Sequence, residues 1–167
     1  RLSTQADVPA IMQLIRELAL FEKAPEQVTN TLAAMEADGF GEKPVFELHV
    51  AEWNGEVVGM ALYFVKYSTW KGKGLYLDDL VVTEKHRGKG IGTTSAKMIT
   101  ELGISEIGFR RIEGLVDVDN IASQRLLLGA GYIQEGTLQN KVTREDIKRY
   151  VQTYIQGKNH VTGLLLS

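Results

Sequence analysis

The stretch Arg87-Gly88-Lys89-Gly90-Ile91-Gly92 decides the fold expected for this chain, because it joins a strand-like segment to a helix-like one. Residues 75–82, Leu-Tyr-Leu-Asp-Asp-Leu-Val-Val, come before it and are rich in β-branched and aromatic residues, as is typical of a strand. In residues 93–102, Ala96 and Ile99 recur on one face of an amphipathic helix. The first N–H groups of a helix have no partner within it, and the helix dipole favours negative charge there. The stretch therefore predicts an anion site that fits a pyrophosphate.

The spacing of the glycines separates the known kinds of phosphate-binding loop. A P-loop needs Gly, four residues and Gly-Lys-Ser/Thr, and the chain has no such string. A dinucleotide fingerprint needs Gly or Ala at its third position, where this chain has Thr93 or Ser95. What remains is Arg-x-x-Gly-x-Gly after an apolar strand. The structural alternative is a surface turn beside a solvated basic cluster.

Composition limits the classes of protein to which the chain can belong. With 167 residues, 44% of them hydrophobic and 24% charged, we expect one globular domain over residues 1–167. A net charge of -2 gives no general attraction to nucleic acid, and no apolar run approaches the roughly 18 residues that span a bilayer. We therefore expect a soluble, cytoplasmic protein with no nucleic-acid or membrane partner.

The cysteine and histidine content narrows the chemistry. The chain has no cysteine, which excludes disulfides, thiolate metal sites and a cysteine nucleophile. The three histidines lack the spacing of a metal site, so we expect no metal. No signal peptide is visible, and the chain begins at Arg1 without a methionine. We treat the N-terminus as truncated, with a first strand ending near Leu2.

The first half of the chain predicts two helices and a hairpin. Thr4-Gln5-Ala6-Asp7 resembles a helix cap, and apolar residues then recur at helical spacing to about Phe21. A second helix is expected from Thr31 to Asp38, with Gly39 ending it as a left-handed cap. Asn54-Gly55, between apolar residues 45–53 and 56–65, is the strongest short hairpin signal.

The second half predicts further strands and helices. The helix after the glycines is expected to continue past Gly103 to about Ile107. Alternation over Arg111 to Val116 predicts a strand, and Asp119-Asn120 opens a helix towards Gly129. The remaining predictions are a strand from Gly131-Tyr132-Ile133 and a hairpin of residues 149–155 and 160–166. This order gives a mixed α/β fold with a mostly antiparallel central sheet flanked by helices.

The glycine stretch resembles the pyrophosphate loop of the GCN5-related N-acetyltransferase (GNAT) family, which carries (Gln/Arg)-x-x-Gly-x-(Gly/Ala). Arg87, Gly90 and Gly92 match this pattern residue for residue. The resemblance implies the acyl-CoA N-acyltransferase fold and acetyl-CoA as co-substrate. It also implies a homodimer, which is common in the branches described next.

The two halves of the chain resemble different branches of that family. The first half is similar to the spermidine/spermine and thialysine acetyltransferases, in the strings Leu14-Ile15-Arg16-Glu17-Leu18-Ala19, Phe21-Glu22, Asp38-Gly39-Phe40-Gly41, Tyr67-Ser68-Thr69-Trp70-Lys71-Gly72 and Leu75-Tyr76-Leu77-Asp78-Asp79. The second half resembles the ribosomal-protein alanine acetyltransferases, in Gly108-Phe109-Arg110-Arg111-Ile112-Glu113, Val116-Asp117-Val118-Asp119-Asn120-Ile121-Ala122-Ser123, Gly131-Tyr132 and Glu135-Gly136. A mosaic chain and an under-sampled branch would both explain the difference.

The resemblance implies which residues bind the co-substrate. The main chain of Leu80, Val81 and Val82 would bind the pantetheine arm, and an N–H there would stabilise the oxyanion. The pyrophosphate would lie on the loop and first helical turn, formed by Arg87, Gly88, Lys89, Gly90, Ile91, Gly92 and Thr93. Asn120 and Ser123 would bond near the pantetheine or cap their helix.

An amine acceptor must lose a proton before it attacks. With an ammonium pKa of about 10, deprotonation at neutral pH costs about 4 kcal/mol, so a carboxylate or a water held by one is needed. Asp78 and Asp79 are the candidates for this carboxylate. Adjacent strand residues point to opposite faces, so one of the two faces the substrate side in either register. In the diamine branch, a tyrosine at the position of Leu127 acts as the acid that protonates the departing thiolate. This chain has leucine there, so Tyr132 is the nearest replacement in the sequence as catalytic acid.

We expect an N-acetyltransferase that uses a direct ternary complex, since no cysteine is present to hold an acetyl group. A small polyamine-like or lysine-like amine is favoured by acidic residues in the region that, by the family resemblance, forms the acceptor groove, namely Glu17, Glu22, Glu26 and Glu36. A protein N-terminus or an antibiotic amine is the alternative acceptor. An acyl-CoA-binding sensor without activity is the alternative from another class.

Overall fold

A computed structural model describes residues 1–116 and 119–135 of the chain. The chain divides into two compact units, Arg1–Ile133 and Gln134–Ser167, and every helix and strand described below lies in the first. The hairpin expected at residues 149–155 and 160–166 lies outside the described residues, and the single domain over 1–167 stays a prediction. Among the described helices, none is both long and apolar enough to cross a bilayer.

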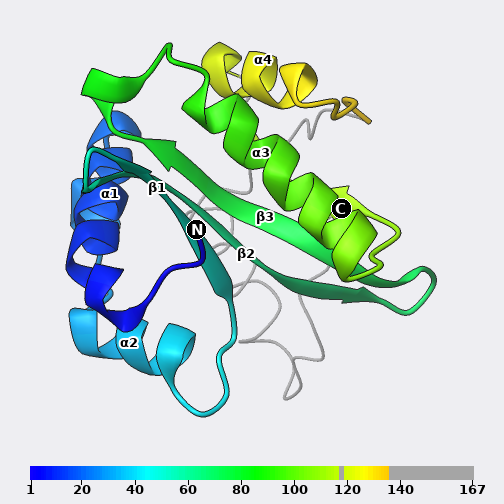
Figure 1. The fold of residues 1–167 in the computed structure, drawn as a ribbon, viewed down its shortest axis with the longest axis horizontal. Coiled ribbons are helices and arrows are strands. Elements are labelled where there is room, and N and C mark those ends of the chain that lie inside the picture. Colours follow the sequence, from blue (N-terminus) through cyan, green and yellow to red (C-terminus); the bar gives the residue numbers. More distant parts are fainter. Residues whose placement is uncertain (117–118, 136–167) are drawn as a thin grey trace, which may run out of the picture. The chain divides into compact units, whose positions relative to one another are not determined.

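The first unit is a four-stranded sheet, in the order β1-β2-β3-β4, with helices on both faces (Figure 1). The pairs β1–β2 and β2–β3 are antiparallel, and β4 is parallel to β3. The mixed α/β architecture expected from the sequence is confirmed. The elements are α1 (Val8–Phe21), α2 (Leu32–Phe40), β1 (Glu47–Trp53), β2 (Glu56–Ser68), β3 (Gly72–Val82), α3 (Ile91–Glu101), β4 (Ile112–Glu113) and α4 (Ile121–Gly129).

Apolar side chains form a separate core on each face of the sheet. On one face, α1 and α2 pack on β1, β2 and β3 through residues such as Ile11, Met35 and Met60. On the other face, Ile99 of α3 packs on β2 and β3 beside Leu75 and Leu77. The alternation of strand side chains therefore assigns each residue to the α1/α2 face or to the α3 face.

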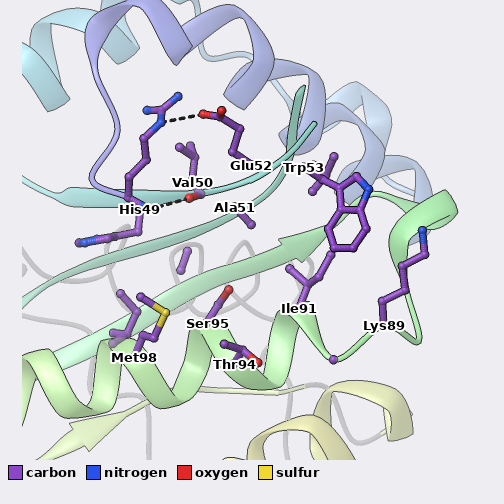
Figure 2. A pocket seen from close by; sticks show the side chains of 15 residues that line it. His49, Val50, Ala51, Glu52, Trp53, Lys89, Ile91, Thr94, Ser95 and Met98 are labelled. Atoms are coloured by element: carbon purple, nitrogen blue, oxygen red, sulfur yellow. Dashed lines mark hydrogen bonds and ion pairs between the residues drawn. The ribbon is translucent and has the colours of Figure 1, made fainter. Parts of the chain in front are cut away.

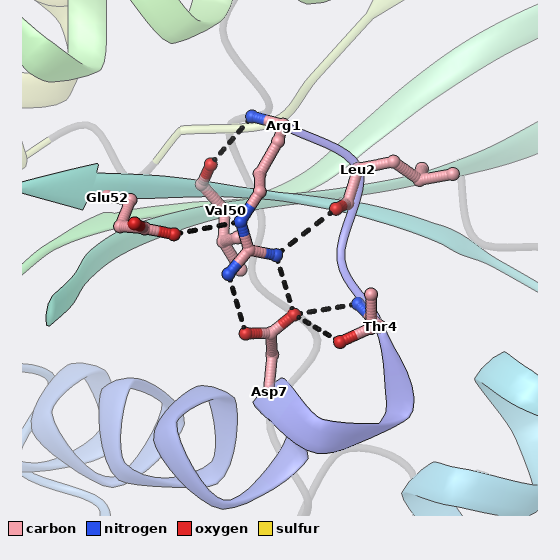
Figure 3. Close-up of polar contacts among 6 residues, drawn as sticks. All are labelled: Arg1, Leu2, Thr4, Asp7, Val50 and Glu52. Atoms are coloured by element: carbon pink, nitrogen blue, oxygen red, sulfur yellow. Dashed lines mark hydrogen bonds and ion pairs between the residues drawn. The ribbon is translucent and has the colours of Figure 1, made fainter. Parts of the chain in front are cut away.

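The first residues of the chain are bound to β1 and to the start of α1 (Figure 3). Leu2 forms an antiparallel bridge with His49, as expected for a strand that ends there. The guanidinium of Arg1 donates to both carboxylate oxygens of Asp7, at 2.8 and 2.9 Å, and its Nε donates to Glu52 at 2.8 Å. Asp7 also accepts from the Thr4 N–H at 2.7 Å, so the predicted cap is confirmed. The Arg1 bonds hold the pKa of Asp7 well below its usual range.

The predicted β1–β2 hairpin is confirmed at its turn. Asn54 and Gly55 have φ of 52° and 81°, and Trp53 pairs with Glu56 across the turn. A two-residue turn with two positive φ values matches the right-handed twist of the strands. This turn sets the register that brings Trp53 beside the glycine loop.

A β-bulge interrupts β3 at Asp78. Leu62 of β2 pairs with Asp79, whereas the next residue, Tyr63, pairs with Leu77. Between these two pairs, β3 advances by two residues while β2 advances by one. Asp78 is therefore the extra, unpaired residue of the bulge. Because Leu62 belongs to the α1/α2 core and Leu77 to the α3 core, the bulge places Asp79 on the α1/α2 face. In a regular strand, Asp79 and Leu77 would share a face.

Two local predictions were wrong, and a third was confirmed only in part. Gly39 does not end α2, which continues to Phe40. A Cβ on Gly39 would lie 2.6 Å from the Phe46 ring, so close packing explains this glycine. Of the strand expected over residues 111–116, only Ile112–Glu113 is paired. No strand is assigned to described residues 131–133. The expected continuation past Gly103 is confirmed, as a π-helical turn over Leu102–Glu106.

The close packing of α3 on α4 depends on Gly92. A Cβ at this position would lie 2.5 Å from Cδ1 of Leu126, so the Leu126 side chain of α4 would have to shift to accommodate a larger residue. Thr93, the next residue, lies on the same side, because a Cβ on Gly129 of α4 would be 3.7 Å from Thr93 Cγ2. This face of α3 is therefore the α4 face.

We expect Gly92→Val to lower the free energy of unfolding by about 1–3 kcal/mol, because the new side chain overpacks against Leu126. Urea denaturation measures the change. The control is Thr94→Val, a change of similar shape at an exposed position of α3, which should change the free energy of unfolding by less than about 0.5 kcal/mol. In a Leu126→Ala background the cost of Gly92→Val should fall, and an unchanged cost would contradict the contact.

Candidate functional site

The N-terminus of α3 has free main-chain N–H groups at the end of the glycine loop. Gly90 is the N-cap residue and has φ of 81°, in the left-handed region that favours glycine, and Gly88 has φ of 74°. The first helical bond runs from the Thr94 N–H to the Gly90 carbonyl, at 3.0 Å. Among the described residues, no side chain caps the helix. Within that part of the chain, the N–H groups of Ile91, Gly92 and Thr93 have no helical partner and can bind an anion.

The N-terminus of α4 differs in this respect. Asn120 Oδ1 accepts a hydrogen bond from the Ser123 N–H at 3.1 Å, so α4 has a side-chain cap. Of the two roles left open for Asn120 and Ser123, the structure shows the capping role. Binding of pantetheine by these residues stays a prediction.

Arg87 fixes the glycine loop to two other elements. Its Nε donates to the main-chain oxygen of Val82 at 2.9 Å, at the end of β3. Its guanidinium carbon lies 5.3 Å from the centre of the Phe21 ring, at the end of α1, within cation–π distance. Arg87 therefore positions the loop as well as supplying charge. The sequence offered no signal for the contact with Phe21, because 66 positions separate the two residues.

In the described structure, β4 pairs with only a short part of the β3 edge that faces it. In the described chain, β4 pairs with β3 only at Leu75–Ile112 and Tyr76–Glu113. Beyond this point β3 continues through the bulge to Val82, and Thr83 and the short 3-10 helix Glu84–His86 then lead to the loop. Leu80, Val81 and Val82 remain paired with β2 on the other edge. The edge without a β4 partner is where a ligand can hydrogen-bond to their main chain.

Three carboxylates gather where the end of α1 meets the bulge. Burial, together with the negative charges of Asp78 and Glu22, raises the pKa of Asp79 from its ordinary value of 3.8 to about 6. Asp79 is half-buried, whereas Asp78 is exposed. A carboxylate with a pKa near neutrality, beside two others, suits both a base and a site for a cationic ligand.

Two other predicted residues lie elsewhere in the described structure. Glu36 accepts a hydrogen bond from the Gln5 side chain at 3.0 Å, so its hydrogen-bond partner in the described structure lies outside the group of three carboxylates. The Tyr132 hydroxyl is 3.1 Å from Thr100 Oγ1 of α3, and burial raises the pKa of Tyr132. No described contact joins Tyr132 to Asp78 or Asp79. A catalytic role for Tyr132 stays a prediction.

A cavity of about 480 Å³, here called the β1–α3 cavity, lies on the other side of α3 (Figure 2). Its walls are residues 49–53 of β1 and the side of α3 that carries Ile91, Thr94, Ser95 and Met98. Lys89 and Gly90 of the glycine loop close one end. On a helix these positions lie opposite the α4 face that carries Gly92 and Thr93. The sequence reasoning missed this cavity.

Comparisons with known proteins agree with this geometry. The model of the acetyltransferase (GNAT) family matches residues 9–132. Thialysine N-epsilon-acetyltransferase of Mus musculus is 44% identical over 114 residues, which cover 64% of this chain and 67% of that protein. Spermidine/spermine N(1)-acetyltransferase-like protein 1 of Homo sapiens is 38% identical over 106 residues, which cover 59% of this chain and 15% of that protein.

Solved structures share the fold at low sequence identity. An aminoglycoside acetyltransferase from an uncultured soil metagenomic sample, in complex with sisomicin, superposes with a TM-score of 0.71. The match covers 86% of this chain and 93% of that chain, at 17% identity. At this identity the similarity concerns the fold alone.

We expect Asp79→Asn to stabilise the protein at about pH 8 and to have little effect at about pH 4. The folded protein binds the Asp79 proton more tightly than the unfolded chain, so ionisation destabilises the fold as the pH rises from about 4 to about 6. A shift of this size corresponds to at most about 3 kcal/mol. Urea denaturation at both pH values measures it, and an equal gain at both would contradict a raised pKa.

Proposed function

Since the chain belongs to the GNAT acetyltransferase family, we propose that it transfers acetyl from acetyl-CoA to a small polyamine-like or lysine-like amine. One observation carries the proposal. The uncapped N-terminus of α3 adjoins a bulged strand that holds two carboxylates, so an anion site and an acidic site lie at the same end of β3. The first fits the pyrophosphate of CoA, and the second fits a cationic acceptor.

The loop residues fit the co-substrate. The positions where Cβ atoms would stand on Gly88 and Gly90 have open space within 4 Å, so a phosphate can approach the main chain. The N–H groups of Ile91, Gly92 and Thr93 would bind it, with Arg87 and Lys89 adding positive charge. When bound, acetyl-CoA supplies an activated acetyl group. The main chain of Leu80 to Val82 would bind the pantetheine arm and stabilise the oxyanion.

Asp79 is the proposed base. Its pKa of about 6 leaves it ionised near neutral pH yet basic enough to accept a proton from an ammonium group, directly or through water. Asp78 and Glu22 would hold a positive charge of the acceptor, which favours a substrate with more than one amino group. Tyr132 is the proposed acid for the departing thiolate. Its present partner, Thr100, does not exclude this role, because the hydroxyl retains its proton.

The names of the relatives favour the same acceptor class. The mouse relative is named for thialysine and the human one for spermidine and spermine. Each of these compounds carries more than one amino group. A homodimer, a cytoplasmic location and the resemblance of the second half to ribosomal-protein alanine acetyltransferases stay predictions.

An acceptor screen with acetyl-CoA tests the proposal, with free thiol as the readout. We expect turnover of diamines, spermidine and thialysine, and at least tenfold lower kcat/KM for a ribosomal-protein N-terminal peptide and for an aminoglycoside. For the best acceptor, kcat/KM should fall below about pH 6 as Asp79 is protonated, and Asp79→Asn should remove most of the activity. The opposite order of acceptors would favour the N-terminal alternative. Acetyl-CoA binding without any turnover would favour a sensor.

A second prediction concerns the position of the loop. Phe21→Leu removes the ring under Arg87 without changing any charge, and we expect it to raise the Kd of acetyl-CoA about threefold. Arg87→Lys keeps the charge but loses the bond from Nε to Val82, so it should weaken binding nearly as much as Arg87→Gln. Calorimetry measures the three affinities. If Arg87→Lys binds like the parent protein, charge alone explains Arg87.

A further inference from the structure

The β1–α3 cavity has the size and lining of a small-molecule site, and the proposed acetyl transfer does not use it. Its volume of about 480 Å³ lies within the roughly 300–1,000 Å³ of ligand pockets. Buried Val58 and Ala61 form an apolar floor. Trp53 and Met98 lie on its sides and remain 47% and 55% exposed. Apolar side chains left exposed around a hollow are typical of a ligand site.

A positively charged side chain lies at each end of the cavity, and the two differ in whether a carboxylate pairs with them. At the end of the cavity formed by the N-terminal segment, Arg1 is already paired with Asp7 and Glu52 (Figure 3). At the loop end, Lys89 has no carboxylate within ion-pair distance among residues 1–116 and 119–135. Its Nζ lies 5.5 Å from the centre of the Trp53 ring. The N-terminus of α3 adds positive potential at the same end.

We propose that the β1–α3 cavity binds a small carboxylic acid with an aromatic or branched apolar body. The carboxylate pairs with Lys89, and the body lies against Trp53, Met98 and the apolar floor. The hydroxyls of Thr94 and Ser95, which have no described side-chain hydrogen bond, are available to a carboxylate oxygen. An acid fits better than an amine because, within residues 1–116 and 119–135, no carboxylate forms an ion pair with Lys89.

The same contacts couple this site to acetyl-CoA, and this part of the inference rests on the proposed function. Lys89 and Gly90 line the cavity and also belong to the loop at the N-terminus of α3. A bound carboxylate neutralises Lys89 and places negative charge near the N–H groups that would bind the pyrophosphate. Each ligand therefore weakens the other by the same factor.

Trp53 provides a direct measurement of binding. The chain has two tryptophans, Trp53 and Trp70, and Trp70 is 94% exposed on the β2–β3 hairpin. In a Trp70→Phe background, the fluorescence of Trp53 is titrated with 3-phenylpropionate, with its neutral amide and with inorganic phosphate. We expect a saturable change with the acid, at least tenfold weaker binding of the amide, and no comparable change with phosphate.

Variants separate the cavity from the pyrophosphate site. Ser95→Phe fills the cavity and should abolish binding of the acid, whereas Ser95→Ala leaves it open and should bind within threefold of the parent. Lys89→Gln should raise the Kd of the acid at least tenfold. Thermal unfolding checks that each variant is folded. Equal binding of acid and amide, or full binding by folded Ser95→Phe, would overturn the assignment.

Calorimetry with acetyl-CoA tests the coupling separately. Saturating 3-phenylpropionate should raise the Kd of acetyl-CoA about threefold in the parent and leave it unchanged in Ser95→Phe. An unchanged Kd in the parent would overturn the coupling, while the fluorescence titration still decides whether the acid binds. Failure of acetyl-CoA to bind at all would instead reject the proposed function.

Discussion

The bulge at Asp78 is the constraint on which the site depends. One extra residue in β3 shifts the alternation of side chains, so that Asp79 shares the α1/α2 face with Leu62 and Val81. Asp79 thereby comes close to Glu22 at the end of α1, and the burial and repulsion there raise its pKa. The same strand is followed by Thr83 and the short 3-10 helix Glu84–His86, which lead into the glycine loop. A single insertion thus links the acidic site to the anion site.

The three glycines of the loop have different physical roles. Gly88 and Gly90 adopt positive φ and have open space around them, which suits close approach of a ligand. Gly92 is needed for packing, because α4 contacts α3 at that point through Leu126. The motif therefore combines a binding requirement with a folding requirement. Helix α3 consequently has one side committed to α4 and another side that lines the β1–α3 cavity.

The contacts of Arg87 and Lys89 explain why a loop rich in glycine keeps one position. Arg87 binds the end of β3 and stacks on Phe21, while Lys89 stacks on Trp53 of β1. Each contact joins the loop to a different element, which lowers the conformational entropy that ligand binding would otherwise cost. The aromatic residues come from α1 and β1, far from the loop in the sequence.

The sequence by itself determined the elements and the donor side of the site. Local signals sufficed for the Asn54-Gly55 turn, the capped start of the first helix and the Arg87–Gly92 loop, because turns and caps depend on neighbouring residues. Only the tertiary structure decided which face Asp79 occupies, why Gly39 and Gly92 are glycines, and that Phe21 and Trp53 hold the loop. Those features depend on strand register and on packing between elements distant in the chain, which local patterns do not encode.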